Sequence, residues 1–174
     1  MNITAIPFHT YLGLEFAEPP YLLQLKAQPH HANHLGTIHA SVLIALAEAG
    51  SGQFLMNHLG DGRPHAPREE AETSRNTTNT RTGSHSPFHH AERDDNSGAG
   101  NSVFPVIRRI EAKFHEGGQG TVYARCTLDP ASLSTVRNDL EVKHRAKILV
   151  PMQVVDAQGT LLLSVSFDWF IQQA

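Results

Sequence analysis

Apolar residues recur along the chain at two spacings, which predict two kinds of element. From Ile38 to about His58, small and apolar residues recur every three or four positions, as on one face of an α-helix. Residues 103–116 alternate instead, with Ile110 and Phe114 on one side and charged residues on the other. These segments predict a long helix followed by a strand with one apolar face.

Shorter apolar stretches predict the remaining elements. We expect a short helix at 7–16, strands at 21–28, 121–128, 143–155 and 160–171, a turn at 117–120 and a partly helical connection at 130–140. One strand, a long helix and then a run of antiparallel strands form an α+β pattern. We therefore expect the long helix to pack on one face of an antiparallel sheet.

Residues 60–102 interrupt this pattern. The segment contains one large apolar side chain, Phe88, among glycine, proline, serine, threonine, asparagine, histidine and charged residues. Such a composition cannot bury enough apolar surface to offset the entropy lost on ordering. We expect a single domain spanning 1–174 with a flexible insertion at 60–102.

Composition and charge exclude several classes of function. A net charge of −3 gives no basic surface for nucleic acid or an anionic membrane. The single cysteine, Cys126, cannot form an intrachain disulfide, which favours a reducing compartment. The chain has no apolar run as long as a membrane span, and it does not begin like a signal peptide. We expect a soluble, cytoplasmic protein without nucleic-acid or membrane partners.

One acid, Glu48, interrupts the apolar sequence of the long helix. Its neighbours from Ile44 to Gly50 are alanine, leucine, isoleucine and glycine. A carboxylate in this setting must either face water or lie in a cleft. Burial would raise its pKa, which is how catalytic carboxylates are commonly tuned. Glu48 is therefore the first candidate for chemistry, with a solvated helix charge as the alternative.

The expected start of this helix offers a second candidate. Thr37 is a suitable N-cap, so the backbone N–H groups of Ile38, His39 and Ala40 would fall in the first turn. Those donors have no partner inside a helix, and the helix dipole adds positive potential there. They could hold a carbonyl oxygen and the oxyanion that develops on it.

These residues together resemble a known family. The string Asn33-His-Leu-Gly36-Thr-Ile-His39-Ala40, followed by Glu48, resembles the hotdog-fold acyl-CoA thioesterases of the PaaI-like branch. In that family an Asn, a Gly and a His-Gly pair precede a helix that carries an Asp or Glu. The resemblance implies a long central helix wrapped by a curved antiparallel β-sheet, and a hydrolase acting on acyl-CoA. It covers the chain outside the insertion.

The chain departs from the family pattern at two points. Ala40 stands where the family has glycine, although a backbone N–H serves equally well from alanine. The serine or threonine that some members carry on the next strand has no counterpart between Phe104 and Gln119.

The resemblance and the helix chemistry assign roles to four residues. Glu48 would activate water as general base or attack as nucleophile, and the Ala40 N–H would be the oxyanion donor. Asn33 and His39 would position the substrate. The alternatives are that Asn33 makes a turn and that His39 caps the helix. Gly36 is the remaining residue of the motif, and we expect it to contact the substrate.

Helix geometry separates the two central groups. Ala40 and Glu48 are eight residues apart, about 12 Å along a helix, whereas a reacting carbonyl must lie about 3 Å from both donor and nucleophile. Two antiparallel helices related by a two-fold axis would bring Ala40 of one chain beside Glu48 of the other. We predict an obligate homodimer with composite sites, alone or as a dimer of dimers (a homotetramer).

Further residues are candidates for substrate contact. Ser41 and Ser51 share the Glu48 face, where they could line an acyl pocket or serve helix packing. Arg109 and Lys113 belong to a set of basic residues that could bind the phosphates of coenzyme A. A metal site is the other interpretation of one histidine cluster (His30, His31, His34 and His39), but no cysteine or acid accompanies it, so we expect no metal and no cofactor.

Two other functions fit the same residues. A non-catalytic hotdog module could bind acyl-CoA or serve as an assembly subunit, an interpretation favoured by Ala40 and the missing strand hydroxyl. A 3-hydroxyacyl-CoA dehydratase could use His39 and Glu48 as a pair. The spacing of Asn33, Gly36 and His39 resembles the hydrolases more closely, so acyl-CoA thioester hydrolysis is the prediction.

Overall fold

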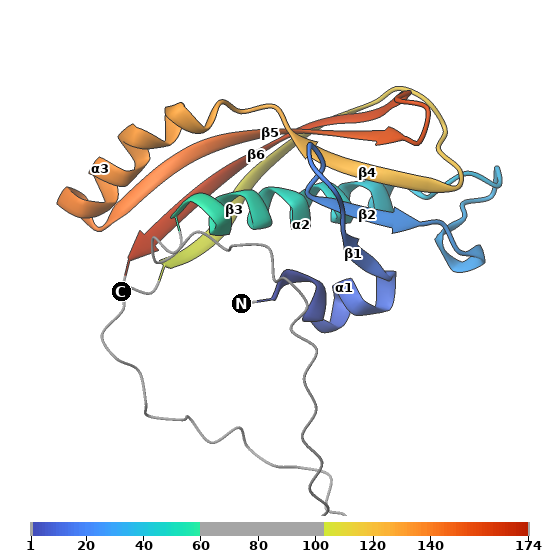
Figure 1. The fold of residues 1–174 in the computed structure, drawn as a ribbon, viewed down its shortest axis with the longest axis horizontal. Coiled ribbons are helices and arrows are strands. Elements are labelled where there is room, and N and C mark those ends of the chain that lie inside the picture. The colour runs from blue at the N-terminus through green and yellow to red at the C-terminus, as the bar shows by residue number, and fades with distance from the viewer. Residues whose placement is uncertain (1, 60–102, 174) are drawn as a thin grey trace, which may run out of the picture. The chain divides into compact units, whose positions relative to one another are not determined.

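The structure, a computed structural model, describes residues 2–59 and 103–173. The insertion expected at 60–102 lies outside the described residues. The described chain forms one six-stranded sheet with the strand order β1-β2-β4-β5-β6-β3, and every neighbouring pair is antiparallel. Figure 1 shows a long helix, α2 (Ala40–Leu59), running under the arch of this sheet. The predicted α+β class is confirmed.

The strands differ widely in length. They are β1 (Leu14–Phe16), β2 (Leu23–Lys26), β3 (Val103–Phe114), β4 (Thr121–Cys126), β5 (Arg145–Asp156) and β6 (Leu161–Gln173). The long strands β5 and β6 lie inside the sheet, and β3 forms one edge of it. Along β6 the side chains alternate between a buried face, which includes Phe167 and Trp169, and a more open face with Ser166 and Asp168.

The central helix is apolar on nearly every side because the sheet curves around it. Its buried residues include Leu46, Ala47 and Phe54, which belong to the same hydrophobic cluster as the inner face of the sheet. Gly50 allows the closest approach: a Cβ there would lie 2.9 Å from Cε of Met152 and 3.2 Å from Cβ of Ala124. A larger residue at position 50 would push the helix away from the sheet.

The N-terminal segment corrects one prediction. The helix expected at 7–16 ends early: a 3₁₀ turn, η1 (Ile3–Ala5), leads into α1 (Pro7–Leu12), and β1 follows. The cause is Gly13, which adopts the left-handed conformation at φ 66° and whose N–H bonds to the last turn of α1. The chain then turns into a strand that pairs with β2.

The connection between β4 and β5 is more helical than predicted. It forms a 3₁₀ turn, η3 (Pro130–Ser132), and then α3 (Leu133–Lys143), which packs on β5. Helix α3 ends at His144, which takes the left-handed conformation at φ 53°. Strand β5 consequently begins two residues later than the predicted strand at 143–155.

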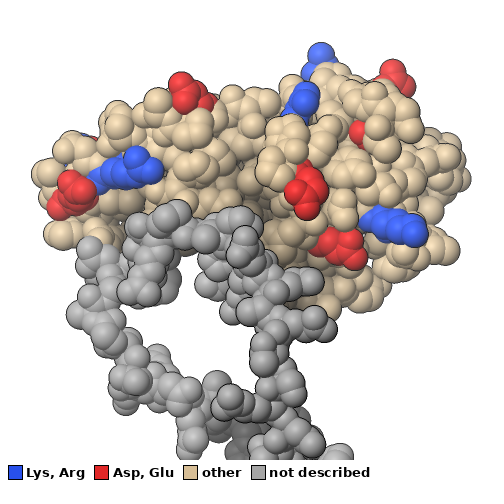
Figure 2. Space-filling view, in the orientation of Figure 1, with Lys and Arg blue, Asp and Glu red and all other residues tan. Residues whose placement is uncertain are grey.

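The described surface carries mixed charge. Figure 2 shows acidic and basic side chains interspersed in this view, without a broad area of one sign. Among the described helices, none has the length and apolar character to span a membrane.

Candidate active site

The first turn of α2 differs from the prediction and is built by His39. The helix begins at Ala40, so Thr37 is not the N-cap. The carbonyl oxygen of His39 accepts the Val42 N–H at 3.0 Å, and its Nδ1 accepts the Ser41 N–H at 3.2 Å. Oγ of Ser41 lies 2.7 Å from the same nitrogen. A capping role for His39, the alternative weighed from the sequence, is therefore present in the structure.

Two of the three predicted backbone donors are already in use. The Ile38 N–H donates to the carbonyl oxygen of Gly118 at 2.9 Å, and the His39 N–H donates to that of His31 at 2.8 Å. Within the described part of the chain, the Ala40 N–H donates no backbone hydrogen bond. The predicted oxyanion donors thus reduce to one amide per chain, that of Ala40.

Asn33 forms the turn that precedes the helix. Its Oδ1 accepts the N–H groups of Leu35 at 2.9 Å and Thr37 at 3.2 Å, while its Nδ2 donates to Oγ1 of Thr37 at 2.9 Å. Gly36 lies in the same turn at φ 75°, a conformation that favours glycine. These bonds favour the turn-forming interpretation of Asn33 over direct contact with substrate.

The loop before α2 is supported from behind by residues that sequence reasoning missed. A Cβ on Gly117 would lie 2.9 Å from Cγ2 of Thr37, and a Cβ on Gly118 would lie 2.5 Å from Cδ1 of Leu162. Both glycines were predicted only as part of a turn. Their lack of side chains lets the β3–β4 connection press against Thr37 and Ile38, which sets the position of Ala40.

His31 fixes the other side of this loop. It belongs to the 3₁₀ turn η2 (Pro29–His31), is almost completely buried, and accepts the Gln28 N–H at Nδ1 over 3.0 Å. Burial, and secondarily the charge of His30, lowers the pKa of His31. His31 therefore favours its neutral form in a structural role. Among the described residues, no three His, Cys, Asp or Glu side chains come together in a metal-binding group.

Glu48 faces solvent on one side and is flanked by protein on the other. Its side chain is exposed in the single chain, although its neighbours Ala47 and Ala49 are buried. Desolvation by the flanking groups raises the pKa of the Glu48 carboxyl above its ordinary value of 4.5, and the positive charge of His9 opposes that rise. A carboxylate with a raised pKa is a stronger base, which suits proton abstraction from water.

The two serines of α2 have different surroundings. Ser41 is exposed near the helix start, where a ligand could reach it. Ser51 is fully buried: its hydroxyl donates to the carbonyl oxygen of Glu48 at 2.7 Å and accepts from Nε1 of Trp169 at 3.1 Å. Both hydrogen bonds of Ser51 are internal, so its position favours helix packing over the predicted substrate contact.

The basic candidates lie on the side of the sheet away from α2. Arg109 pairs with Asp168 and Lys113 with Ser164 across β3 and β6, which places both on the outer face. Arg109 also forms an ion pair with Glu111.

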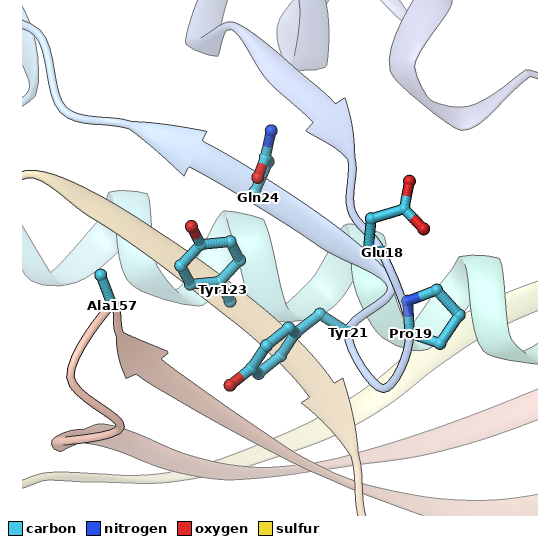
Figure 3. A pocket seen from close by; sticks show the side chains of 6 residues that line it. All are labelled: Glu18, Pro19, Tyr21, Gln24, Tyr123 and Ala157. Carbon is cyan, nitrogen blue, oxygen red and sulfur yellow. The ribbon is translucent and has the colours of Figure 1, made fainter.

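A separate hollow of about 320 Å³ also lies on the outer face. Figure 3 shows Gln24 and Tyr123 projecting into it from β2 and β4, with Tyr21 and Glu18 at its margin. The rings of Tyr21 and Tyr123 lie 4.8 Å apart. Because it opens on the face opposite to α2, this hollow is not part of the site at Glu48 and Ala40.

Comparisons in sequence and in structure give different results. No protein-family model matches the chain, and no curated protein matches it in sequence. Solved structures match it in fold. A protein of unknown function from Pseudomonas aeruginosa, described as a probable thioesterase, gives a TM-score of 0.66 at 16% identity, covering 99% of this chain and 91% of that one.

Two further structures extend this comparison. A Chlorobaculum tepidum protein of unknown function gives a TM-score of 0.63 at 12% identity, over 98% of this chain and 88% of its own. A Bacillus halodurans protein solved with CoA gives 0.57 at 14% identity, over 96% and 76%. At these identities the likeness shows the fold alone. It confirms the hotdog fold that the sequence resemblance implied, and the roles of single residues stay predictions.

Proposed function

We propose that the protein hydrolyses acyl-CoA thioesters in a homodimer, at sites formed by Glu48 of one subunit and the Ala40 N–H of the other. One observation carries this proposal. The two groups that thioester hydrolysis requires, an amide donor without an acceptor among the described residues and a carboxylate with a raised pKa, lie on the same helix. Eight residues of helix separate them by about 12 Å, so one chain cannot apply both to one carbonyl.

The free edge of β3 supports a second copy as the missing partner. Strand β3 is twelve residues long, and no described strand pairs with its outer side. On its α2-facing side Ile110 is 43% exposed and Phe114 is 46% exposed. A long edge with apolar side chains is a ready template for pairing with another strand. Pairing two β3 edges about a two-fold axis would set the α2 helices antiparallel, as the composite site requires.

The proposed reaction uses each group once. Glu48 takes a proton from a water molecule, and the water oxygen adds to the thioester carbonyl carbon. The N–H of Ala40 of the partner subunit donates to the carbonyl oxygen as its charge develops. The C–S bond then breaks, the proton on Glu48 passes to the departing sulfur, and the free acid and CoA leave.

The raised pKa of Glu48 favours the role of base over that of nucleophile. A carboxylate becomes a better proton acceptor as its pKa rises toward the working pH. Direct attack by Glu48 would instead form a mixed anhydride with the acyl group. Hydroxylamine added during turnover would trap that anhydride as an acyl hydroxamate. Because hydroxylamine also attacks acyl-CoA directly, the diagnostic quantity is the hydroxamate formed above the enzyme-free rate, and no such excess is the result expected for general-base catalysis.

Evidence from the comparisons supports the substrate class. One of the structures with the same fold holds CoA, and another is described as a probable thioesterase. An acyl-CoA with its thioester between Glu48 of one subunit and Ala40 of the partner subunit would lie near the partner's Ser41, which is exposed, and near the loop that carries the partner's Asn33 and the partner's Gly36.

The experiment is a thiol-release assay over short, medium, long and aromatic acyl-CoAs. We expect turnover of at least one class by the wild-type protein, and a loss of roughly 100-fold or more in Glu48→Gln, which keeps the size of the side chain. Glu116→Gln, in the loop after β3, is the matched control and should retain full activity.

The assay also separates the alternatives. Binding of acyl-CoA without thiol release by wild-type protein would identify a binding module. Conversion of 3-hydroxyacyl-CoA without free thiol would identify a dehydratase that uses His39 and Glu48. Either result would overturn the proposed hydrolysis.

A further inference from the structure

The hollow on the outer face of the sheet combines aromatic rings with a carboxylate. In Figure 3 the rings of Tyr21 and Tyr123 lie at one side of it, and Glu18 and Pro19 lie at the other. No lysine or arginine is among the described residues that line it. The basic residues next along β2 and β4 on this face are Lys26 and Arg125, and Arg125 donates instead to Oε1 of Gln153 at 2.8 and 3.0 Å. The hollow therefore has a negative lining without a positive group of its own.

The two tyrosines form a continuous aromatic surface. Tyr123 lies on β4 and Tyr21 directly precedes the strand β2 with which β4 pairs. Their ring centroids are 4.8 Å apart and the planes are tilted by 32°. Both residues are half-buried, so each ring keeps part of its surface open to solvent. The face of an aromatic ring carries negative charge and attracts a cation within about 6 Å of the centroid.

A hydrogen bond in the turn between β1 and β2 holds Glu18 close to these rings. The Tyr21 N–H donates to the carbonyl oxygen of Glu18 at 3.0 Å. Pro19 and Pro20 stand between the two residues, and their fixed φ angles restrict the turn. The side chain of Glu18 is exposed and forms no ion pair with the other described residues. Its negative charge is available to a ligand in the hollow.

The side chain of Gln24 is oriented by its neighbour on β1. In the sheet Gln24 lies opposite Glu15 on one side and Tyr123 on the other. Its Nε2 donates to Oε2 of Glu15 at 3.1 Å. Because the oxygen and nitrogen of a planar amide lie on opposite sides of Cδ, Oε1 points away from Glu15, toward Tyr123. The hollow thus also faces the negative end of an amide dipole.

We propose that this hollow is a binding site for a small organic cation that carries an alkylated ammonium group. The tyrosine faces contact the alkyl groups, and Glu18 balances the charge of the nitrogen. Gln24 turns its amide oxygen toward the cation. Rings, carboxylate and amide belong to different elements and each favours positive charge, so a neutral ligand of the same shape gains little from them. This site does not depend on the hydrolysis proposed for Glu48.

The experiment compares choline with its neutral isostere, the alcohol in which a tert-butyl group replaces the trimethylammonium group. Each is titrated into the full-length protein while NMR follows the ring protons of Tyr21 and Tyr123. We expect saturable binding of choline in the millimolar range, with shifts in both rings. The neutral alcohol should bind roughly 5-fold more weakly or less, because it has the shape without the charge.

Variants assign the binding to the hollow. Tyr123→Leu removes one ring and should weaken choline binding by roughly 2- to 5-fold, whereas Tyr123→Phe keeps the aromatic face and should bind like the wild type. Glu18→Gln removes only a charge from an exposed turn and should weaken binding by a similar factor. Tyr11→Leu is the matched control, since Tyr11 is an exposed tyrosine on α1, outside the hollow. It should leave the affinity for choline unchanged.

Several results would overturn the proposal. Equal binding of choline and the alcohol would show that shape alone explains the interaction. An unchanged affinity in both Tyr123→Leu and Glu18→Gln, or an equal loss in Tyr11→Leu, would place the cation elsewhere. Choline that shifts neither ring would show that the hollow stays empty. If Tyr123→Leu does not fold, Glu18→Gln and the comparison of the two ligands decide the case.

Discussion

At the residue scale, the raised pKa of Glu48 links the stability of the protein to pH. Its pKa is raised in the folded protein, so the folded state binds this proton more tightly than the unfolded state does. The stability contributed by protonated Glu48 is therefore fully present below its ordinary pKa and is lost as the pH rises through the folded pKa. Glutamine imitates the protonated form at every pH.

The prediction is a pH-dependent gain of stability in Glu48→Gln. We expect the variant to match the wild-type melting temperature near pH 4 and to exceed it at pH 7, measured by calorimetry at fixed protein concentration. Glu116→Gln should show no such difference. A variant that melts below the wild type at pH 7 would contradict the desolvated position of the carboxylate.

Single residues also show what sequence could and could not predict. Glu48 was identified because a charge among apolar neighbours is visible in the letters, and Ala40 because helix ends follow known chemistry. The hydrogen bonds of Asn33 and the burial of Ser51 depend on the final packing. The packing of α1 against α2 left no signal in the sequence, because only the fold brings these two helices together.

At the element scale, one buried hydrogen bond joins α2 to the sheet. Nε1 of Trp169 donates to the hydroxyl of Ser51 in the core. Ser51→Ala would leave that N–H buried without a partner, so we expect a loss of about 1 to 3 kcal/mol in unfolding free energy. Trp169 is the only tryptophan in the chain, so its fluorescence during urea unfolding reports on this contact directly.

The matched control for that variant is Ser134→Ala, on the exposed side of α3. It should leave the urea midpoint nearly unchanged. Equal midpoints for Ser51→Ala and the wild type would show that the bond contributes nothing.

The loop before α2 gives a second prediction at this scale. Asn33→Ala removes the acceptor of two backbone N–H groups and should cost about 1 to 3 kcal/mol of stability together with much of the activity. Asn33→Asp keeps that acceptor and loses only the amide donor, so it should retain most of both. If Asn33→Asp is as inactive as Asn33→Ala but folds normally, the amide donates to the substrate and the turn-forming role is insufficient.

The boundaries of elements were harder to predict than their existence. The long helix, the sheet and their order follow from hydrophobic spacing. The early end of α1 depends on the left-handed Gly13, and the start of α2 at Ala40 depends on hydrogen bonds that Ile38 and His39 make to Gly118 and His31. Gly118 is distant in sequence from Ile38, and His31 belongs to an irregular turn. The local sequence pattern therefore could not predict these two hydrogen bonds.

At the scale of the whole molecule, the proposed composite site requires two chains. The composite arrangement predicts that the wild-type protein is a dimer or tetramer at all concentrations at which it is active, measured by light scattering after gel filtration. A charge placed on the free edge, as in Ile110→Lys, should weaken assembly and activity together. Ile110→Val keeps the apolar side chain and serves as the control; an active monomer would contradict the composite site.

The most direct test combines two inactive subunits. Ala40→Pro removes only the proposed oxyanion donor, since proline is tolerated at the first position of a helix, and we expect a loss of roughly 100- to 1,000-fold in kcat. Glu48→Gln removes the base. A heterodimer of these two variants, purified through two different affinity tags, retains one site with both groups intact. The composite site predicts about half of the wild-type activity for this heterodimer, while both homodimers stay inactive; a heterodimer as inactive as its parents would contradict it.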